Sequence, residues 1–475
     1  MSISFYGGAT KYNLIDCPIS RKNTIICKST NLISKPSYYA YWAYEQTKLL
    51  FLNKSTSGLI IQKQNMLNKK KDFEYKPGFE FKYLKGTRPK AGYLILSAAN
   101  PSNRGYPLIE LWDMNKQIKL HTYKVDLKDI FNKLGWSSQK DSLNRTIRLW
   151  HPYLLDNGSI ITNVVGYGQH KTILLDQCGK FIKANEDLLG HHSIEGGKDG
   201  YIYTSYYGDY EGRFFGGKLI DSKLHPLGFE SHGIAVIDQD LNTIKKLSLL
   251  DIYEKNGLIG DIYGNETTIK DPFHLNDVEP FIDAYGNKFV LLSMKGHSRV
   301  MALDLESEKV LWFIDRATGH QHDVDVIKVN NDGSIDISIF DNNAQMFKKL
   351  FSAGNRVAFF KGLPMNKNLK TFNIGDLEKY EKYKLKYESF ESLDEKFKPT
   401  TNTEGRADIL VENNSLMIED TNFGRLFETD IKDGNMLWHY SNNIQDKTPY
   451  MMSWSRRINK LPNNLNIENF NKCNI

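Results

Sequence analysis

The segment from Asp271 to Asn343 decides the fold expected for this chain. It begins DPFHLNDVEPFIDAYGNKFVLLSMKGHSRVMALDLESEKVLWFI (271–314) and continues through GHQHDVDVIKVNNDGSIDISIFDNN (319–343). Short apolar runs rich in Val, Ile, Leu and Phe alternate with turn signals, which is the pattern of consecutive antiparallel strands. Each of the two strand sets opens with a histidine, His274 and His322. Polar groups that recur at one phase of a repeat are expected to point at the same place in space.

The same pattern recurs from Gly92 onward, as hairpins around turns such as 156–158, 198–200 and 331–333. Two hairpins make four strands, which is one propeller blade. The repeat predicts blades at 92–145, 146–188, 189–252, 271–316, 317–375 and 400–442. Insertions are expected at 207–233 and 380–400, the second as a short charged surface helix.

The fold class is therefore predicted to be all-β, a six-bladed β-propeller with a small β-rich N-terminal appendage. The expected boundaries are 1–90 for the appendage and linker, 91–445 for the propeller and 446–475 for a C-terminal tail.

Composition excludes several classes of protein. The net charge of +6 is spread over scattered lysines, and no basic stripe interleaves with aromatic residues, so no nucleic-acid partner is expected. No stretch reaches the roughly 18–20 apolar residues of a membrane span. The N-terminus shows no charged-then-apolar leader, which leaves the compartment open. Four cysteines lack zinc-site spacing, although Cys17 and Cys27 could close a small loop under oxidising conditions.

Four histidines lie on the first strand of a predicted blade: His151, His192, His274 and His322. The innermost strand of each blade lines the central channel, so these side chains are expected to converge there. Because alternate side chains of a strand point in opposite directions, only one of His191 and His192 is expected to face the channel.

Two chemistries remain open for such a cluster. Neutral imidazoles bind Zn, Cu or Fe, so a metal centre is one possibility. The other is group transfer through a covalent histidine, because imidazole is a neutral nucleophile near pH 7. In that case Asn276 and Lys295 supply a donor and a positive charge to an anionic group in transfer.

The chain resembles the bacterial arylsulfotransferases in an ordered series of motifs between about Gly92 and Tyr440. His191-His192-Ser193-Ile194 is similar to the family's H-H-D-I, and His274-Leu275-Asn276-Asp277 to its H-x-N-S. Gln321-His322-Asp323 is similar to its Q-H-D and Phe340-Asp341-Asn342-Asn343 to its F-D-N-G. The last blade resembles the family in a segment that contains Arg425-Leu426-Phe427-Glu428, Asp433-Gly434 and Leu437-Trp438.

The resemblance implies a six-bladed propeller and transfer of a sulfuryl group from a phenolic sulfate ester to a phenolic acceptor. The transfer would pass through a sulfohistidine and need no nucleotide sulfate, no cofactor and no metal. His322 would be the nucleophile, and His274 and His192 would bind sulfuryl oxygens or handle the phenol proton. Asn276 would donate a hydrogen bond. His151 is also expected to contact the substrate, because of its position on the first strand of its blade.

The chain departs from the family's motifs at two positions. Lys295 stands where the family has an arginine, in Ser293-Met294-Lys295, so the charge is kept while the planar fork is lost. Ser193 replaces an aspartate.

Aromatic side chains are expected at the channel mouth, where they would hold the phenyl rings: Tyr206, Tyr207, Phe273 and Trp150. The expected partners are small molecules, a phenolic sulfate donor and a phenol acceptor, and a homodimer is left open. The family suggests a periplasmic or extracellular location. A non-catalytic binding propeller is the alternative from another class, favoured by Lys295, and a metal-dependent hydrolase is the third.

Overall fold

The computed structural model describes most of the chain after residue 76. The described residues are 77–100, 106–136, 147–166, 169–211, 214–215, 218–219, 229–262, 271–315, 317–345, 351–352, 354–367, 371–374, 383, 385–388, 390–394, 396–442, 444–445, 448–449 and 451–474. The predicted β-rich appendage falls almost entirely outside them, as does the Cys17–Cys27 pair.

The chain divides into two compact units. One comprises Met1–Phe73 and Tyr210–Phe229, of which the structure describes chiefly the hairpin β11 (Phe214–Phe215) and β12 (Lys218–Leu219). The other comprises Glu74–Asp209 and Glu230–Ile475 and carries every residue discussed below.

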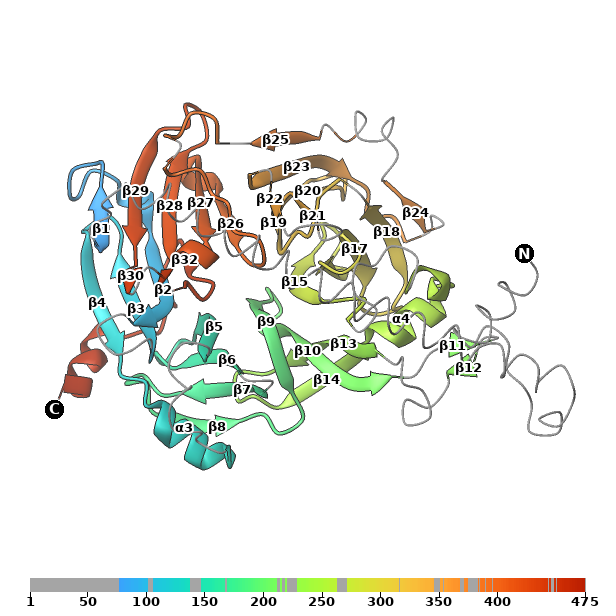
Figure 1. The fold of residues 1–475 in the computed structure, drawn as a ribbon, viewed down its shortest axis with the longest axis horizontal. Helices are drawn as coiled ribbons and strands as arrows, with labels where there is room; N and C mark the ends of the chain where they lie inside the picture. Colours follow the sequence, from blue (N-terminus) through green and yellow to red (C-terminus); the bar gives the residue numbers. More distant parts are fainter. Residues whose placement is uncertain are drawn as a thin grey trace, which may run out of the picture. The chain divides into compact units, whose positions relative to one another are not determined.

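Six sheets, antiparallel except for the outermost pair of blade IV, follow one another along the second unit and form the six blades of a β-propeller (Figure 1). The predicted fold is confirmed. In each blade the strands run from the innermost outward, and the inner strands lie nearest the centre of the ring in Figure 1.

The first three blades follow this order. Blade I contains β32 (Arg456–Ile458), β2 (Tyr93–Asn100), β3 (Tyr106–Asp113) and β4 (Ile118–Tyr123). Blade II contains β5 (Arg148–Leu154), β6 (Ile160–Gly166), β7 (Gln169–Leu175) and β8 (Phe181–Ala184). Blade III contains β9 (Leu189–Gly196), β10 (Ile202–Glu211), β13 (Phe229–Ile237) and β14 (Thr243–Ser248).

Of the last three blades, IV and VI carry a fifth, outer strand. Blade IV contains β15 (Leu275–Ile282), β16 (Lys288–Met294), β17 (Arg299–Asp304), β18 (Val310–Asp315) and β24 (Phe372–Asn373). Blade V contains β19 (Asp323–Val329), β20 (Ile335–Asp341), β23 (Arg356–Leu363) and β25 (Lys386–Glu388). Blade VI contains β26 (Arg406–Leu410), β27 (Ser415–Asp420), β28 (Arg425–Asp430), β29 (Met436–Ser441) and β1 (Gly78–Phe81).

Helices are short and lie between strands. The α-helices are α3 (Leu127–Leu134) and α4 (Leu249–Lys255), each started by a capping side chain, Asp126 and Ser248. The 3-10 helices are η2 (Pro89–Ala91), η5 (Ile259–Ile262), η6 (Val411–Asn413), η7 (Thr421–Phe423) and η8 (Ile467–Asn474). Two further hairpins are β21 (Ala344–Gln345) with β22 (Phe351–Ser352), and β30 (Ile444–Gln445) with β31 (Thr448–Pro449). No helix in the described ranges is long and apolar enough to cross a membrane.

The turn residues explain why the hairpins form where the sequence predicts them. Gly158, Gly200, Gly286 and Gly333 each occupy positive φ between 80° and 86°, which glycine adopts without steric cost. Asn414 takes the same role in blade VI with φ of 51°. Because Asn tolerates this left-handed conformation, the blade keeps its tight turn without a glycine.

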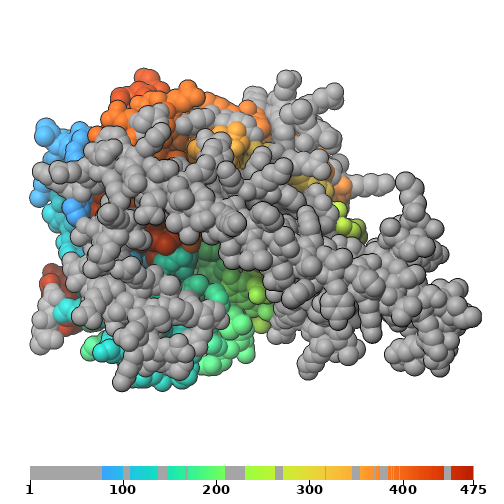
Figure 2. Space-filling view, in the orientation of Figure 1, coloured from blue at the N-terminus to red at the C-terminus, as the bar shows by residue number. Residues whose placement is uncertain are grey.

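Residues at the two ends of the chain complete blades I and VI, so the propeller extends beyond the predicted range 91–445. Strand β32 pairs antiparallel with β2, and β1 pairs with β29 at the rim of blade VI. In Figure 2 the blue segment around β1 lies beside the orange-red atoms of blade VI. Edge strands with unpaired backbone groups favour such closure. The sequence alone does not show it because β32 is only three residues long.

The expected charged surface helix at 380–400 is wrong for the described part of that segment. Lys386–Glu388 forms β25, which pairs with β23 as the outermost strand of blade V. The backbone groups along the edge of β23 are available to pair with a strand but not with a helix on the surface. Pairing with β23 therefore decides the conformation of this segment.

A disulfide joins Cys178, in the turn between β7 and β8, to Cys473 in η8. The two Cα atoms lie 5.1 Å apart across a separation of 295 residues. The C-terminal segment that supplies β32 is thus covalently tied to blade II.

Side chains on successive inner strands connect the blades around the channel. The Val278 N–H donates to Ser193 Oγ (3.1 Å), the Val324 N–H to Asp277 Oδ2 (3.0 Å) and the Ala407 N–H to Asp323 Oδ2 (2.9 Å). Each bond runs from a backbone N–H of one inner strand to a side chain on the inner strand of the preceding blade. Ser193 therefore fills the place of the family's aspartate as an acceptor between blades III and IV.

Candidate active site

Three of the predicted histidines lie together where the inner strands begin. The ring centroid of His192, on β9, is 6.0 Å from that of His274 and 6.1 Å from that of His322. His274 directly precedes β15 and His322 directly precedes β19. The structure thus brings one imidazole from each of blades III, IV and V to the same region.

The imidazole of His322 is held in one tautomer. Its Nδ1 lies 2.9 Å from the His320 carbonyl and 2.6 Å from Asn342 Oδ1, both of which can only accept. Nδ1 therefore carries the proton, and Nε2 presents a lone pair. Nε2 is buried and has no hydrogen-bond partner among the described residues. This is the arrangement that a nucleophilic imidazole requires.

The amide of Asn342 is itself fixed by the loop that precedes β26 of blade VI. Asn342 Nδ2 donates to the carbonyls of Thr401 (3.1 Å) and Glu404 (2.8 Å), so its Oδ1 must face His322. Asn342 is part of the F-D-N-N motif, but the sequence assigns it no role because these carbonyls lie about 60 residues away.

Burial lowers the pKa of His322 well below its usual value, and the nearby charge of Lys295 lowers it further. The hydrogen bond to Asn342 acts in the opposite direction and is outweighed. His322 is consequently neutral at pH 7, the state in which Nε2 is a nucleophile.

His274 is oriented by a carboxylate that the sequence analysis did not single out. Asp271 Oδ2 is hydrogen-bonded to His274 Nδ1, while Asp271 Oδ1 accepts from the His274 backbone N–H (3.1 Å) and contacts His232 Nε2 (2.9 Å). Burial opposes ionisation of Asp271, but the charges of His274 and His232 outweigh it and lower the Asp271 pKa. An ionised carboxylate on Nδ1 leaves Nε2 of His274 to exchange protons with a substrate.

Both His191 and His192 lie beside His274, contrary to the expectation that only one faces the channel. The His191 ring is 5.1 Å from that of His274, and its Nδ1 is 2.7 Å from the Leu275 carbonyl. The β9–β10 pairing shifts register between Thr204 and Tyr206, opposite this pair. A bulge interrupts strict alternation, which the sequence pattern does not reveal.

His192 is held between two tryptophans. The Trp150 ring meets it edge-on at 4.3 Å, and the Trp454 ring stacks on it at 5.3 Å. The Nε1 atoms of both tryptophans and Nδ1 of His192 are buried without a partner among the described residues. Buried polar atoms are nearly always hydrogen-bonded, so a ligand or water is expected to occupy this region.

Asn276 offers further unpaired polar atoms. Its side chain is fully buried, yet neither Oδ1 nor Nδ2 has a partner among the described residues, and the same is true of Ser293 Oγ. Leaving a buried polar group unsatisfied costs about 1–3 kcal/mol. A bound anion that accepts from Asn276 Nδ2 would recover that energy.

Two cations act on the histidines. Burial is the main cause of the lowered pKa values of His274 and His322, and the charge of Lys295, which follows β16, lowers both further. Burial also lowers the pKa of His192, and Arg148, which the sequence analysis missed, acts in the same direction. The Arg148 guanidinium lies 4.0 Å over the Trp150 ring and forms a bidentate pair with Glu404 at 2.6 and 2.7 Å.

In the structure, His151 takes part in contacts between blades. Its Nε2 is hydrogen-bonded to Arg406, and its Nδ1 lies 3.3 Å from Glu195 Oε1. The Ile194 nitrogen is also 3.3 Å from Nδ1, the same inter-blade position that Ser193 fills one blade later. Both ring nitrogens are therefore engaged, and the ring is fully buried. His151 does not offer a nitrogen to a substrate.

Two of the expected aromatic contacts are also core residues. Phe273 is fully buried against Tyr253 and His297, with ring centroids at 5.0 and 5.6 Å. Tyr206 belongs to the core cluster between blades II and III. Tyr207, the neighbour of Tyr206, instead packs on His191 at 4.4 Å and is only half-buried.

The histidines could also hold a metal ion. One ring nitrogen from each of His191, His192 and His274 lies within 4.8 Å of the others. His191 and His274 bond a carbonyl and a carboxylate through Nδ1, as metal-ligating histidines do. The charge of Lys295 on the same site acts against a cation and favours an anion.

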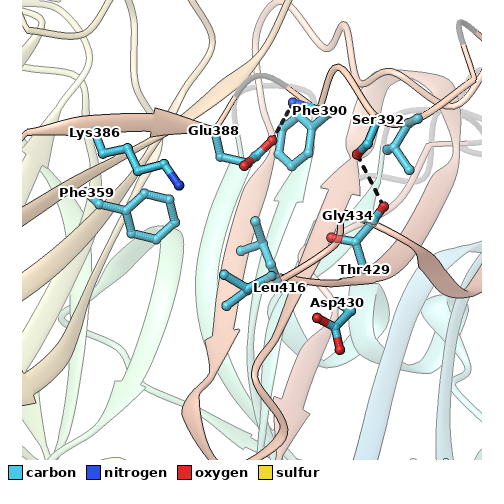
Figure 3. Close-up of a pocket in the computed structure, with 11 residues that line it drawn as sticks. Phe359, Lys386, Glu388, Phe390, Ser392, Leu416, Thr429, Asp430 and Gly434 are labelled. Carbon is cyan, nitrogen blue, oxygen red and sulfur yellow. Dashed lines mark hydrogen bonds between the residues drawn. The ribbon is translucent and has the colours of Figure 1, made fainter.

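A separate small cavity lies between the outer strands of blades V and VI (Figure 3). Its volume is about 30 Å³, and Phe359, Lys386, Phe390 and Leu416 are among its lining residues. It holds one or two waters and has no room for a phenyl sulfate.

The family model described as Arylsulfotransferase (ASST) matches residues 151–443. The chain belongs to the arylsulfotransferase family. The matched region spans blades II to VI and contains His192, His274, Asn276, Lys295 and His322. It establishes an arylsulfotransferase-like domain in this protein. No curated protein matches the chain.

Solved structures similar to this arylsulfotransferase family member are distant. A protein of unknown function from Bacteroides caccae shares 11% identity with a TM-score of 0.41, covering 77% of this chain and 98% of its own. A putative 6-phosphogluconolactonase from Bacteroides fragilis shares 10% with a TM-score of 0.38 and coverages of 78% and 99%. The hydrazine synthase of Kuenenia stuttgartiensis shares 14% with a TM-score of 0.37 and coverages of 73% and 78%.

Proposed function

We propose that this protein transfers a sulfuryl group from a phenolic sulfate ester to a phenolic acceptor through a sulfohistidine at His322, without a nucleotide sulfate donor. The observation that carries the proposal is the free Nε2 lone pair of a neutral, buried His322 whose Nδ1 proton is held by Asn342 and the His320 carbonyl. Family membership supports the same class of reaction.

In the first half-reaction His322 Nε2 attacks the sulfur in line, and the bond between sulfur and the phenolic oxygen breaks. The ring, still protonated on Nδ1, becomes a cationic sulfoimidazolium that carries the anionic sulfonate. Asn342 Oδ1 and the His320 carbonyl stabilise that cation, because both accept from Nδ1. The departing phenolate takes a proton from His274, whose imidazolium form is stabilised by Asp271.

In the second half-reaction His274 Nε2 removes the proton of the acceptor phenol. The phenolate oxygen attacks the sulfur, the nitrogen–sulfur bond breaks and neutral His322 is regenerated, giving ping-pong kinetics. Asn276 and Lys295 face the sulfuryl oxygens in this scheme. Their contribution is positioned charge and hydrogen bonding, which dominates transfer reactions of this kind.

The test is release of 4-nitrophenol from 4-nitrophenyl sulfate in the presence and absence of a simple phenol. We expect release that depends on the phenol in the wild type, loss of release in His322→Ala, and retention in the matched control His439→Ala on outer strand β29 of blade VI. Intact-mass analysis with donor alone should show addition of one sulfuryl group to the wild type and none to His322→Ala. Absence of release from folded wild type over several donors and acceptors would indicate a binding propeller without this chemistry.

A metal-dependent hydrolase is the second candidate, favoured by the three convergent ring nitrogens of His191, His192 and His274. Elemental analysis of the purified protein, followed by chelation, separates the two. Activity lost on chelation, restored by Zn²⁺ and independent of an acceptor phenol would favour the hydrolase.

A further inference from the structure

A second polar region lies on the same inner strands, beyond the histidine cluster. Glu195, Glu279, Asp325 and Asp408 each stand two residues after the inter-blade position of their strand, which is filled by Ser193, Asp277, Asp323 and Arg406. At about 3.3 Å of rise per residue, these carboxylates lie roughly 10 Å further along the channel than His192, Asn276 and His322. No step of the proposed transfer uses them.

The carboxylates line a cavity. It has a volume of about 270 Å³, and Glu195, Glu279, Asp325 and Asp408 face it from four consecutive blades. Arg406, Arg456 and Arg457 line it from blades VI and I. The space accommodates several water molecules as well as an ion.

The arginines do not neutralise all of these acids. Arg456 pairs with Glu195 at 2.7 Å, and Arg457 pairs with Glu428 outside the cavity at 3.2 Å. Arg406 is shared by two acids, since it pairs with Asp408 and its Nε lies 3.8 Å from Asp323 Oδ2. Glu279 accepts only the Val326 N–H, at 3.3 Å, among the bonds shown.

Asp323 and Asp325 carry oxygens that no described group satisfies. Asp323 is 1% exposed, and its Oδ2 accepts the Ala407 N–H while its Oδ1 has no partner. Asp325 Oδ2 is likewise buried without one.

Two of these carboxylates, together with that of Asp323, have the spacing of a cation site. One oxygen from each of Asp323, Asp325 and Asp408 lies within 4.8 Å of the others. Oxygens on opposite sides of a Ca²⁺ ion stand about 4.6–5.2 Å apart, twice the usual Ca–O distance. An all-oxygen set suits hard cations and not the softer metals that histidine favours.

We propose that Asp323, Asp325 and Asp408 bind a Ca²⁺ ion in the channel, with water in the cavity completing its coordination. The ion joins inner strands β19 and β26 of blades V and VI. Asp323 follows His322 directly, so the bound ion holds in place the strand that begins next to the proposed nucleophile. The site is structural and distinct from the histidines, and it does not depend on the proposed transfer reaction.

The test is calcium binding by the full chain after removal of bound metal with a chelator and dialysis. Isothermal titration calorimetry should show one Ca²⁺ per chain, and the melting temperature should rise with Ca²⁺ concentration and by less with equal Mg²⁺. Asp325→Asn should weaken Ca²⁺ binding at least tenfold and remove the rise in melting temperature. The control Asp332→Asn, in the exposed turn of the same blade, should bind as the wild type does.

A separate readout guards against a variant that is merely unfolded. Because the introduced amide carries no charge among the neighbouring carboxylates, Asp325→Asn should melt at or above the temperature of the metal-free wild type. Asp408→Asn is the second variant and should also bind Ca²⁺ at least tenfold more weakly. The proposal would be overturned if the metal-free wild type showed neither a heat of Ca²⁺ binding nor a Ca²⁺-dependent rise in melting temperature. Unchanged Ca²⁺ binding in both folded variants would also overturn it. Binding of Mg²⁺ without Ca²⁺ would overturn the choice of ion.

Discussion

Asn342 Oδ1 lies 2.6 Å from Nδ1 of His322, and the Asn342 amide is locked in that orientation by two carbonyls. Together with the His320 carbonyl, this side chain decides which nitrogen of His322 is protonated and which is free. In the proposed reaction it also stabilises the positive charge that forms on the ring.

Replacing Asn342 should lower activity without removing the nucleophile. A hydrogen bond to a charged group contributes about 1.5–3 kcal/mol, so Asn342→Leu should reduce kcat for sulfuryl transfer by roughly 10- to 150-fold. Asn342→Asp restores an acceptor and adds a negative charge, which should raise the pKa of His322 and move the acid limb of the rate profile to higher pH. Asn330→Ala, in a turn of the same blade, is the control; an Asn342→Leu enzyme as active as that control would contradict the role.

The pH dependence of the first half-reaction should lack an acid limb near pH 6.5. Burial and Lys295 lower the pKa of His322, and a base with a lowered pKa stays unprotonated to lower pH. For a donor such as 4-nitrophenyl sulfate, whose phenolate leaves without a proton from His274, kcat/KM should therefore stay constant as the pH falls through about 6.5, the ordinary histidine value, and decline only below it. A decline centred at or above pH 6.5 would be inconsistent with the buried, neutral His322.

Removing the Lys295 charge should change both rate and pH profile. Lys295→Met should lower kcat by at least about 10²-fold if the ammonium stabilises the sulfuryl oxygens in transit. Burial lowers the pKa values of His274 and His322 and that ammonium lowers them further, so its loss should move the acid limb to higher pH. Lys295→Arg keeps the charge and should retain activity within about tenfold of the wild type. Equal activity in Met and Arg variants would exclude Lys295 from the site.

Asp271→Asn should impair proton transfer more than donor binding. Asparagine cannot stabilise the His274 imidazolium and need not hold its Nδ1 proton, so kcat should fall by about 10²–10⁴-fold with little change in KM. The loss should be smaller for donors with acidic phenols such as 4-nitrophenol, since their phenolates leave without a proton. An equal loss for acidic and weakly acidic phenols would argue against proton transfer by His274.

Acid should destabilise the fold through the buried histidines. His151, His191, His192 and His322 all have pKa values lowered by burial, so below about pH 6.5 the unfolded chain binds more protons than the folded one. This contribution to the free energy of unfolding is complete above pH 6.5 and is lost as the pH falls. His192→Gln should reduce the dependence of the denaturant midpoint on pH between 6.5 and 5; an unchanged slope would show that His192 is accessible to protons in the folded state.

Loss of the disulfide should destabilise the propeller. Cys178 and Cys473 close a loop of nearly three hundred residues, and removing such a bridge typically costs about 2–5 kcal/mol. Cys473→Ser should lower the denaturant midpoint accordingly, and a reducing agent should lower the wild-type midpoint to that of the variant. A reducing agent that further lowers the midpoint of Cys473→Ser would point to another disulfide.

Much of the fold was predictable because its signals are local. The turns around Gly158, Gly200, Gly286 and Gly333 need a residue that adopts positive φ. The alternating apolar runs beside these turns are recognisable as strands from a few neighbouring residues. The blade count follows from repetition of that unit. Position in the repeat also indicated that His192, His274 and His322 would lie near one another.

What the sequence by itself determined about this protein is therefore the blade, the number of blades and the strand on which each histidine lies. Only the tertiary structure decided which nitrogen of His322 is free, because the Asn342 amide is oriented by Thr401 and Glu404 from far along the chain. It also decided that His151 bonds Arg406 across the ring, that β32 closes blade I and that Cys178 pairs with Cys473. These contacts join residues hundreds of positions apart. Secondary-structure propensity and hydrophobic periodicity report only on residues close in sequence, so they cannot identify such distant partners.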